Sequence, residues 1–416
     1  MTLFALLPGV PAHAAELASS CYLNESDTTG KVQGVNIQAM LPIASVSKVM
    51  TSWWAVTAKG LDYRFETRVS LTPQGDGSYN MHIEGSRDPY FGIQSLQFLI
   101  SELNKRKITN INRLTYDENF KFFWDPTESA VAIGHYGLND PGPAKVQSEL
   151  SLGDILFGYA DTMRFALREK NVQLFQNPQF QIGEISYQPS ADFHPVATTR
   201  VFKMHSAPIS NALKEMTRNS NNNAANQIFQ HLGGAQDFAT IAQSELGLGP
   251  SQIRFVNGSG DSMERGSGKV YNSATCPAVI RVLQNLRKKL KATGHDLETV
   301  LALSGGDPTS TVSKIYNNDL TDHTLVAKTG TVAPDVTLGG LVHTQSGDIY
   351  FFYNMKSEGT VEDWREARSM IRAKLITLIK SFNGGKPVAY KAIEFMDFDR
   401  GSVLAEDASQ TVGKMR

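Results

Sequence analysis

The sequence predicts a mixed α/β fold in which an antiparallel sheet is flanked by helices. Residues 324–332 are rich in β-branched side chains and alternate as a strand does. Two further alternating segments, 337–344 and 349–356, are joined by a Ser-Gly-Asp turn, which is typical of a β-hairpin. Apolar residues then recur at helical spacing from Trp364 to Phe382, which predicts a helix whose apolar side packs on this sheet.

A second helix is expected to begin at Ser45. Val49, Met50, Trp53 and Trp54 follow this serine at the spacing of one buried helix face. Ser45 therefore lies at a helix N-terminus, where the helix dipole favours negative charge. Its backbone N–H is a candidate donor to a developing oxyanion.

Length and composition allow a large core and exclude several classes of partner. The chain has 416 residues, of which 41% are hydrophobic, and a formal net charge of −1. This length allows two or three domains. Lysines and arginines are spread evenly, so the charge pattern does not indicate a protein that binds nucleic acid or acidic membranes. No apolar run approaches the roughly 18 residues that span a bilayer, and no transmembrane segment is expected.

Three short motifs in a fixed order indicate the chemistry. They are Ser45-Val46-Ser47-Lys48, Ser220-Asn221-Asn222 and Lys328-Thr329-Gly330. Each motif alone is a weak signal, because serine, asparagine and lysine are common residues. On a helix, residues three apart share a face, so the amine of Lys48 can reach the hydroxyl of Ser45. A base beside a hydroxyl nucleophile predicts serine acyl transfer.

The third motif supplies a neighbouring cation for the Ser45–Lys48 pair and a strand edge for the substrate. Lys48 can accept a proton only if burial or a neighbouring cation lowers its pKa, and Lys328 is the candidate cation. Gly330 removes a side chain from an edge strand at which a substrate backbone would approach. The backbone N–H of Thr331 would be a second oxyanion donor, and Lys328 and Thr329 would hold a terminal carboxylate.

The motif set resembles that of penicillin-binding proteins and the related serine β-lactamases. More of the chain is similar to the low-molecular-mass class C penicillin-binding proteins, a family of D-alanyl-D-alanine carboxypeptidases and endopeptidases. The similar segments are Gly60 to Thr67, Gly85-Ser86-Arg87-Asp88-Pro89, Arg218 to Asn222, Asn257-Gly258-Ser259-Gly260 and Ala327 to Thr331. The resemblance covers most of residues 38–383 and implies a serine β-lactamase or transpeptidase-like fold.

The resemblance also implies a role for each motif residue. Ser45 would be the acylated nucleophile, Lys48 its general base, and Ser220 the hydroxyl that relays a proton to the leaving amine. The expected substrate-binding residues are Asn222, Lys328, Thr329, Gly330 and Thr331. Asn221 stands where the family more often has aspartate, which removes a charge from a position without a main chemical role.

The implied reaction is removal of the terminal D-alanine from peptidoglycan stem peptides through an acyl-serine intermediate. Cleavage of D,D cross-links is also implied, with β-lactam antibiotics as covalent inhibitors. No cofactor is expected, and no metal site is expected because the nine histidines lack metal-ligand spacing.

Two alternative functions stay open. One is a serine β-lactamase, although no clearly placed glutamate would activate water. The other is a non-hydrolytic penicillin sensor or wall-binding module, which would usually have a membrane segment.

The motif spacing predicts the domain organisation. Residues 15–68 and 200–385 are expected to form the catalytic domain, and 386–416 an irregular C-terminal tail. The gap between Ser45 and Ser220 is short for the family. Residues 69–199 are therefore expected to be a reduced insertion that partly continues the catalytic domain, with one or both accessory domains missing or vestigial.

Export is expected from the N-terminal segment. Residues 3–10 form a short apolar run and Ala12-His13-Ala14 resembles a cleavage site, so 1–14 is interpreted as a signal peptide remnant. The expected location is the periplasm of a bacterium or another exported site.

Cys21 and Cys276 would be able to pair in an oxidising compartment, but the sequence leaves this pairing open. It also leaves open the preference between carboxypeptidase and endopeptidase activity, the residue at stem position three and the oligomeric state.

Overall fold

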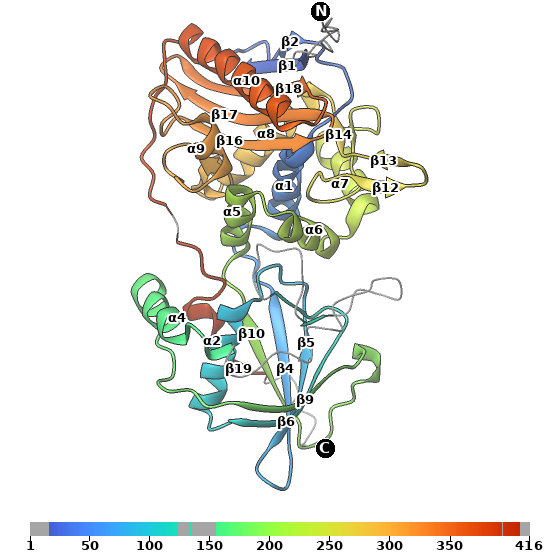
Figure 1. Ribbon diagram of the computed structural model, residues 1–416, viewed down its shortest axis with the longest axis vertical. Coiled ribbons are helices and arrows are strands. Elements are labelled where there is room, and N and C mark those ends of the chain that lie inside the picture. Colours follow the sequence, from blue (N-terminus) through green and yellow to red (C-terminus); the bar gives the residue numbers. More distant parts are fainter. Residues whose placement is uncertain (1–15, 124–132, 135–154, 393, 408–416) are drawn as a thin grey trace, which may run out of the picture.

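The computed structural model describes residues 16–123, 133–134, 155–392 and 394–407. Its two large sheets form two lobes, the upper and lower halves of the molecule in Figure 1. The predicted signal peptide remnant at 1–14 lies outside the described residues.

The sheet of the upper lobe contains the predicted hairpin. Its strand order is β15-β16-β17-β18-β1-β2, and every neighbouring pair is antiparallel. The strands are β15 (Ala302–Leu303), β16 (Leu325–Val332), β17 (Asp335–Thr344), β18 (Gly347–Lys356), β1 (Glu16–Asn24) and β2 (Gln33–Val35). The predicted antiparallel sheet is confirmed.

Helices cover both faces of this sheet. On one face α10 (Val361–Ser381) buries Ala367, Ile371 and Leu375 against β17 and β18. On the other face lie α1 (Ser47–Lys59) and α8 (Cys276–Lys291), as Figure 1 shows. The lobe also contains α5 (Ile209–Asn219), α6 (Asn222–His231), α7 (Gly234–Leu246) and α9 (Thr311–Tyr316). Among the described helices, none is long and apolar enough to cross a membrane.

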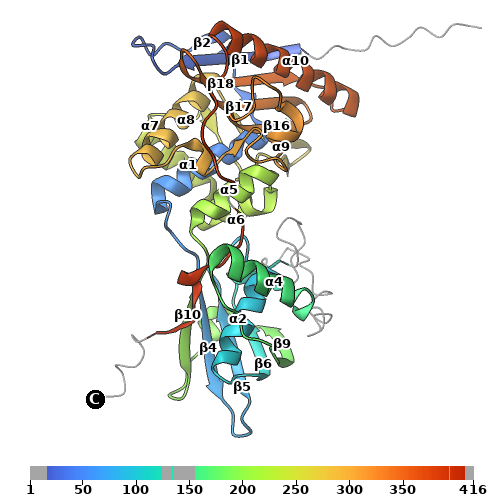
Figure 2. The same cartoon turned by 90° about the vertical axis from the view of Figure 1, so that its left-hand side faces the viewer.

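The lower lobe has its own sheet, of order β19-β10-β4-β5-β6-β9. The strands are β4 (Glu66–Pro73), β5 (Tyr79–Glu84), β6 (Asn110–Tyr116), β9 (Gln181–Tyr187), β10 (Arg200–His205) and β19 (Ala405–Glu406). Strands β5, β6 and β9 run parallel, and the remaining pairs are antiparallel. The helices α2 (Ile93–Lys105) and α4 (Tyr159–Phe165) cover one face of this sheet (Figure 2) and complete a separate core.

Shorter elements connect these layers. One small sheet has three strands, β11 (Ile253–Arg254), β14 (Ser273–Ala274) and β3 (Leu41–Pro42). Two further sheets have two strands each: β12 (Met263–Arg265) with β13 (Gly268–Val270), and β7 (Lys121–Phe122) with β8 (Ile133–Gly134). Short helical turns are η1 (Ala44–Val46), η2 (Ala166–Lys170), η3 (Ser190–Asp192), η4 (Leu297–Thr299) and η5 (Arg400–Ser402).

The lower lobe requires a correction of the predicted domain boundaries. It begins with β4, which starts before residue 69, and it includes β10, which lies wholly after residue 199. The segment 394–407, expected to belong to an irregular tail, places Met396, Phe398 and Leu404 in the lower core, and β19 pairs with β10. These strands meet partners far away in the sequence, which local alternation does not reveal. The absence of accessory domains found elsewhere in the family stays a prediction.

Cys21 and Cys276 form a disulfide that joins β1 to the first residue of α8, with their Cα atoms 6.1 Å apart. Both cysteines are buried. The pairing that the sequence left open is thus present, and it ties the sheet to the helix that packs beside α1.

A buried pair of carboxyl groups attaches the C-terminal segment to the rest of the molecule. Asp88 and Asp397 are each 5% exposed and hydrogen bond to each other. The Ser95 hydroxyl donates to Asp397 at 3.1 Å, and the Tyr90 N–H donates to Asp88 at 3.0 Å. Burial raises the pKa of Asp88 to about 6. Burial, followed by repulsion from Asp88, raises the pKa of Asp397 well above its usual range.

This pair predicts how stability depends on pH. Because both pKa values are raised by folding, the folded protein holds more protons than the unfolded chain, and stability is lost as pH rises from about 4 through about 6 and above. Asp397→Asn removes one of the two ionisable groups. Relative to wild type, this variant is expected to gain about 1 kcal/mol between pH 4 and pH 8 in urea unfolding. An equal difference from wild type at both pH values would contradict this account.

Candidate active site

The first motif places Ser45 in η1, directly before α1. The preceding turn is pinned to the sheet, because Thr337 donates a hydrogen bond to the Ile43 carbonyl at 3.0 Å and Asn354 donates to the Pro42 carbonyl at 2.8 Å. Ala44 has a left-handed backbone with φ 47°. This conformation costs a non-glycine residue about 1–2 kcal/mol, and it persists because the surrounding contacts determine it. The half-buried Ser45 is thereby held at the N-terminus of a buried helix.

The Lys48 side chain is 0% exposed and makes three hydrogen bonds. Its Nζ lies 3.0 Å from Ser45 Oγ, 2.7 Å from Asn222 Oδ1 and 3.0 Å from the Ser259 carbonyl oxygen. Burial is the main cause that lowers the pKa of Lys48 well below its usual value, and repulsion from Lys328 is the second. This amine therefore loses its proton more readily than an exposed lysine, as a base for Ser45 requires.

The second and third motifs meet at Ser220. This residue ends α5 with a left-handed backbone of φ 58°, and the next N–H, that of Asn221, donates to the Met216 carbonyl at 2.9 Å. Lys328 Nζ lies 2.9 Å from Ser220 Oγ and 2.7 Å from the Thr329 carbonyl oxygen. Lys328 is 0% exposed, and burial lowers its pKa to about 7. A titratable cation thus lies beside the Ser220 hydroxyl.

The strand β16 presents an open edge next to Ser45. On its outer side β15 pairs only with Val326 and Ala327, so within the described residues 328–332 have no strand neighbour there. A side chain at Gly330 would place its Cβ 2.2 Å from Thr337 Oγ1 and 2.9 Å from the Ser45 nitrogen. Only glycine allows β16 to lie this close to the turn that carries Ser45. The open edge, which is able to pair with an extended peptide, therefore lies next to the serine.

Hydroxyl groups flank the same edge. Thr329 Oγ1 donates to Thr311 Oγ1 at 2.9 Å, and Arg368 donates to Thr331 Oγ1 at 3.1 Å. Neither Thr311 nor Arg368 belongs to a motif, so neither was predicted from the sequence. Arg368 brings a positive charge to the end of β16, where an anionic group of a ligand would be favoured.

The structure gathers the predicted site residues around Ser45 and β16. These residues are Ser45, Lys48, Ser220, Asn222, Lys328, Thr329, Gly330 and Thr331. Hydrogen bonds link Lys48 to Ser45 and Asn222, and Lys328 to Ser220 and Thr329. Gly330 approaches Ser45, and Thr331 follows Gly330 on the strand. Over the described ranges, no group of three or more His, Cys, Asp or Glu side chains is arranged to hold a metal ion. The arrangement contains the Ser45 hydroxyl with a buried amine beside it, and the Ser220 hydroxyl hydrogen-bonded to a second buried amine.

Asn226 is a supporting residue that was not predicted. Its Oδ1 accepts hydrogen bonds from the N–H groups of Gly258 at 3.1 Å and Ser259 at 3.0 Å. These bonds hold the turn whose Ser259 carbonyl contacts Lys48. Gly260, with φ 83°, lets this turn approach, because a Cβ there would lie 1.9 Å from the Ala44 oxygen. The available sequence signal was the position of Asn226 one helical turn after Asn222.

The fold and this pair of serine–lysine contacts define a serine acyl-transfer enzyme. The chain matches the D-Ala-D-Ala carboxypeptidase 3 (S13) family over residues 18–128 and 183–377, and it belongs to this family of serine peptidases. The family and the fold class predicted from the sequence are thereby confirmed.

Solved structures agree with this assignment. Bd3459, a predatory peptidoglycan endopeptidase from Bdellovibrio bacteriovorus, is 36% identical with a TM-score of 0.86, covering 94% of this chain and 100% of that one. A second structure of this endopeptidase shows it acylated by penicillin G and in complex with the immunity protein Bd3460. That structure is 36% identical to this chain with a TM-score of 0.83, and it covers 94% of this chain and 100% of its own. Penicillin-binding protein 4 from Haemophilus influenzae shares the fold. It is 15% identical with a TM-score of 0.58, covering 87% of this chain and 97% of its own. No curated protein matches the sequence.

The two buried lysines predict a measurable coupling. Below about pH 7 Lys328 is charged and repels a proton on Lys48. Lys328→Met is expected to raise the pKa of Lys48 without restoring its usual value, because burial is the larger cause. The ¹³Cε shift of Lys48, followed through a pH titration, reports this change, and Lys328→Arg is the control that keeps a charge. An unchanged titration of Lys48 in Lys328→Met would rule out the coupling.

Proposed function

We propose that this protein is a D,D-peptidase that removes the terminal D-alanine from peptidoglycan stem peptides and also cleaves D,D cross-links. The observation that carries this proposal is the buried Lys48 amine, 3.0 Å from Ser45 Oγ, at one side of a site whose other side holds Ser220 2.9 Å from Lys328. Membership of the S13 family supports it. So does the likeness to Bd3459, which is itself a peptidoglycan endopeptidase.

Each proposed step uses groups already in place. Lys48 takes the proton of Ser45 while Oγ forms a bond to the carbonyl carbon of the penultimate D-alanine. The N–H groups of Ser45 and Thr331 stabilise the oxyanion. The C–N bond then breaks, and the proton taken up by Lys48 passes through the Ser220 hydroxyl to the departing amine, which leaves Lys48 neutral again. Water hydrolyses the acyl ester and returns a proton to Ser45, so that the overall reaction is hydrolysis of one amide bond.

The same edge would orient the substrate. An extended peptide adds to the free side of β16 at residues 328–332 and is gripped through its main chain. Its terminal carboxylate meets Lys328 and Thr329, with Arg368 contributing positive charge beside Thr331. Asn222, which already accepts a hydrogen bond from Lys48, holds the substrate amide. The carboxylate of penicillin would occupy the same place, in keeping with the acylation of Bd3459 by penicillin G.

The proposed site of action is the periplasm or another exported compartment. Peptidoglycan is found there, and disulfides such as Cys21–Cys276 persist in oxidising environments outside the cytosol. We infer from both that the chain matures after export.

The first test is the reaction with benzylpenicillin, followed by intact mass, peptide mapping and assay of the remaining drug, alongside release of D-alanine from a stem pentapeptide. Wild type is expected to form a long-lived adduct on Ser45 and to release D-alanine. Ser45→Ala is expected to lose both activities by at least about 1,000-fold. Ser52→Ala, which truncates a buried serine elsewhere on α1, is the matched control and should retain them.

The other outcomes separate the alternatives. Rapid drug consumption without a lasting adduct would indicate a serine β-lactamase. An adduct without release of D-alanine would indicate a penicillin sensor, and intact drug with no adduct would contradict the proposal.

The two lysines also predict the pH dependence of kcat/KM, which reports groups of the free enzyme. Activity rises on the acid side as Lys48 loses its proton, at a pH below the usual lysine range. It falls again above about pH 7, because Lys328 then loses the charge that holds the carboxylate. In Lys328→Arg the guanidinium stays charged, so the alkaline decline is expected to disappear even if the rate is lower. A level profile from pH 7 to pH 9 in wild type would contradict this role of Lys328.

A further inference from the structure

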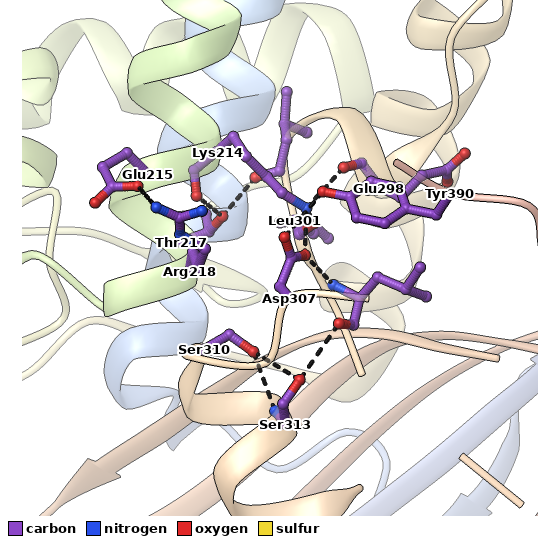
Figure 3. A network of polar contacts seen from close by, with 12 residues as sticks. Lys214, Glu215, Thr217, Arg218, Glu298, Leu301, Asp307, Ser310, Ser313 and Tyr390 are labelled. Carbon is purple, nitrogen blue, oxygen red and sulfur yellow. Dashed lines mark hydrogen bonds and ion pairs between the residues drawn. The ribbon is translucent and has the colours of Figure 1, made fainter. Parts of the chain in front are cut away.

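An ion pair buried behind Ser220 takes no direct part in the proposed chemistry. Lys214 lies on α5, and Asp307 lies in the loop between β15 and α9. Their side chains are 3% and 0% exposed, and Lys214 Nζ is 2.6 Å from Asp307 Oδ2 (Figure 3). Lys214 also donates to the carbonyl oxygens of Glu298 at 2.9 Å and Leu301 at 2.6 Å. All three N–H groups of the ammonium are therefore satisfied.

The carboxylate of Asp307 is equally well satisfied. Its Oδ2 accepts the Leu303 N–H at 2.8 Å, and its Oδ1 accepts the Tyr390 hydroxyl at 2.9 Å. The ring of Tyr390 faces Lys214, with 4.8 Å between Nζ and the ring centroid. Tyr390 belongs to the segment that leaves α10 and continues into the lower lobe. The cluster thus joins α5, residues 298–307 around β15, and the C-terminal segment.

This cluster fixes the helix that ends at Ser220. Lys214 lies six residues before Ser220, and between them Thr217 donates to the Val300 carbonyl at 2.6 Å. Both side chains fasten the same region of α5 to residues 298–307. Because Ser220 adopts a left-handed conformation at the end of this helix, its hydroxyl position depends on how the preceding turns are held.

The loop that carries Asp307 also reaches the strand of the third motif. Ser310 caps α9 by accepting the Ser313 N–H at 3.1 Å, and Ser313 in turn donates to the Leu303 carbonyl at 3.4 Å. The first residue of α9, Thr311, accepts a hydrogen bond from Thr329 at 2.9 Å. A continuous set of contacts therefore connects Asp307 with both sides of the contact between Ser220 and Lys328.

A buried ion pair is weak as a source of stability, because desolvation offsets the attraction between the charges. Its directed hydrogen bonds do specify geometry. From these contacts we propose that Lys214, Asp307 and Tyr390 are positioning residues that hold Ser220 Oγ opposite Lys328 Nζ, and so set the rate at which the leaving amine is protonated. This inference rests on the proposed function of the same site.

Tyr390→Phe is the mildest test, since it removes one hydroxyl and leaves the ion pair in place. It is expected to lower the rate of Ser45 acylation by benzylpenicillin, and kcat for D-alanine release, by about three- to tenfold. KM should stay within about twofold, because the carboxylate-binding residues are unchanged. Tyr22→Phe is the matched control, because its hydroxyl contacts only Gln33 on the surface at 2.7 Å in the described structure. Asp307→Asn is a second variant, expected to have a larger effect in the same direction.

A double-mutant cycle separates positioning from a general loss of structure. In a Ser220→Ala background, where slow acylation is followed over hours by intact mass, Tyr390→Phe is expected to have no further effect. Equal effects in both backgrounds, or wild-type rates in Tyr390→Phe and Asp307→Asn, would overturn the inference. Failure of the wild-type protein to acylate at all would instead overturn the proposed function.

Discussion

The site depends on a lysine amine that is removed from water. Burial makes the charged form of Lys48 unfavourable, which is what turns an ordinary cation into a proposed base. An amine in this position must also have its hydrogen bonds satisfied, because an unpaired buried polar group is costly. Its acceptors are Ser45, Asn222 and Ser259, which come from three separate segments. The positions of α1, α6 and the 257–260 turn are therefore coupled through one nitrogen atom.

Two left-handed residues that are not glycine lie where the proposed chemistry occurs. Ala44 directly precedes the proposed nucleophile Ser45, and Ser220 is the proposed proton relay; both have left-handed conformations. Each is maintained by contacts from elsewhere: hydrogen bonds from β17 and β18 hold the turn before Ser45, and the anchored α5 holds Ser220. Strain of this kind persists only where the surrounding structure is rigid, and both positions lie within the disulfide-linked upper lobe.

The two lobes are connected by more than the chain segments around β4 and β10. The C-terminal segment contacts Asp307 through Tyr390 and then enters the lower lobe, where Asp397 meets Asp88. One segment therefore touches the polar cluster behind Ser220 and a buried carboxyl pair beside the lower core. The geometry of the site and the attachment of the lower lobe share this physical link.

The sequence by itself determined the local elements and the identity of the motif residues. The helix after Ser45, the strand 324–332, the following hairpin and the final helix were predictable because apolar periodicity is a local property. The motif order was enough to indicate the family. Tertiary structure alone decided the pairing of β4, β10 and β19, the partner of Cys21, and the roles of Asn226 and Lys214. Those features depend on groups that are distant in sequence and meet only on folding, and the burial that shifts the pKa values of Lys48 and Lys328 exists only once these groups have packed together.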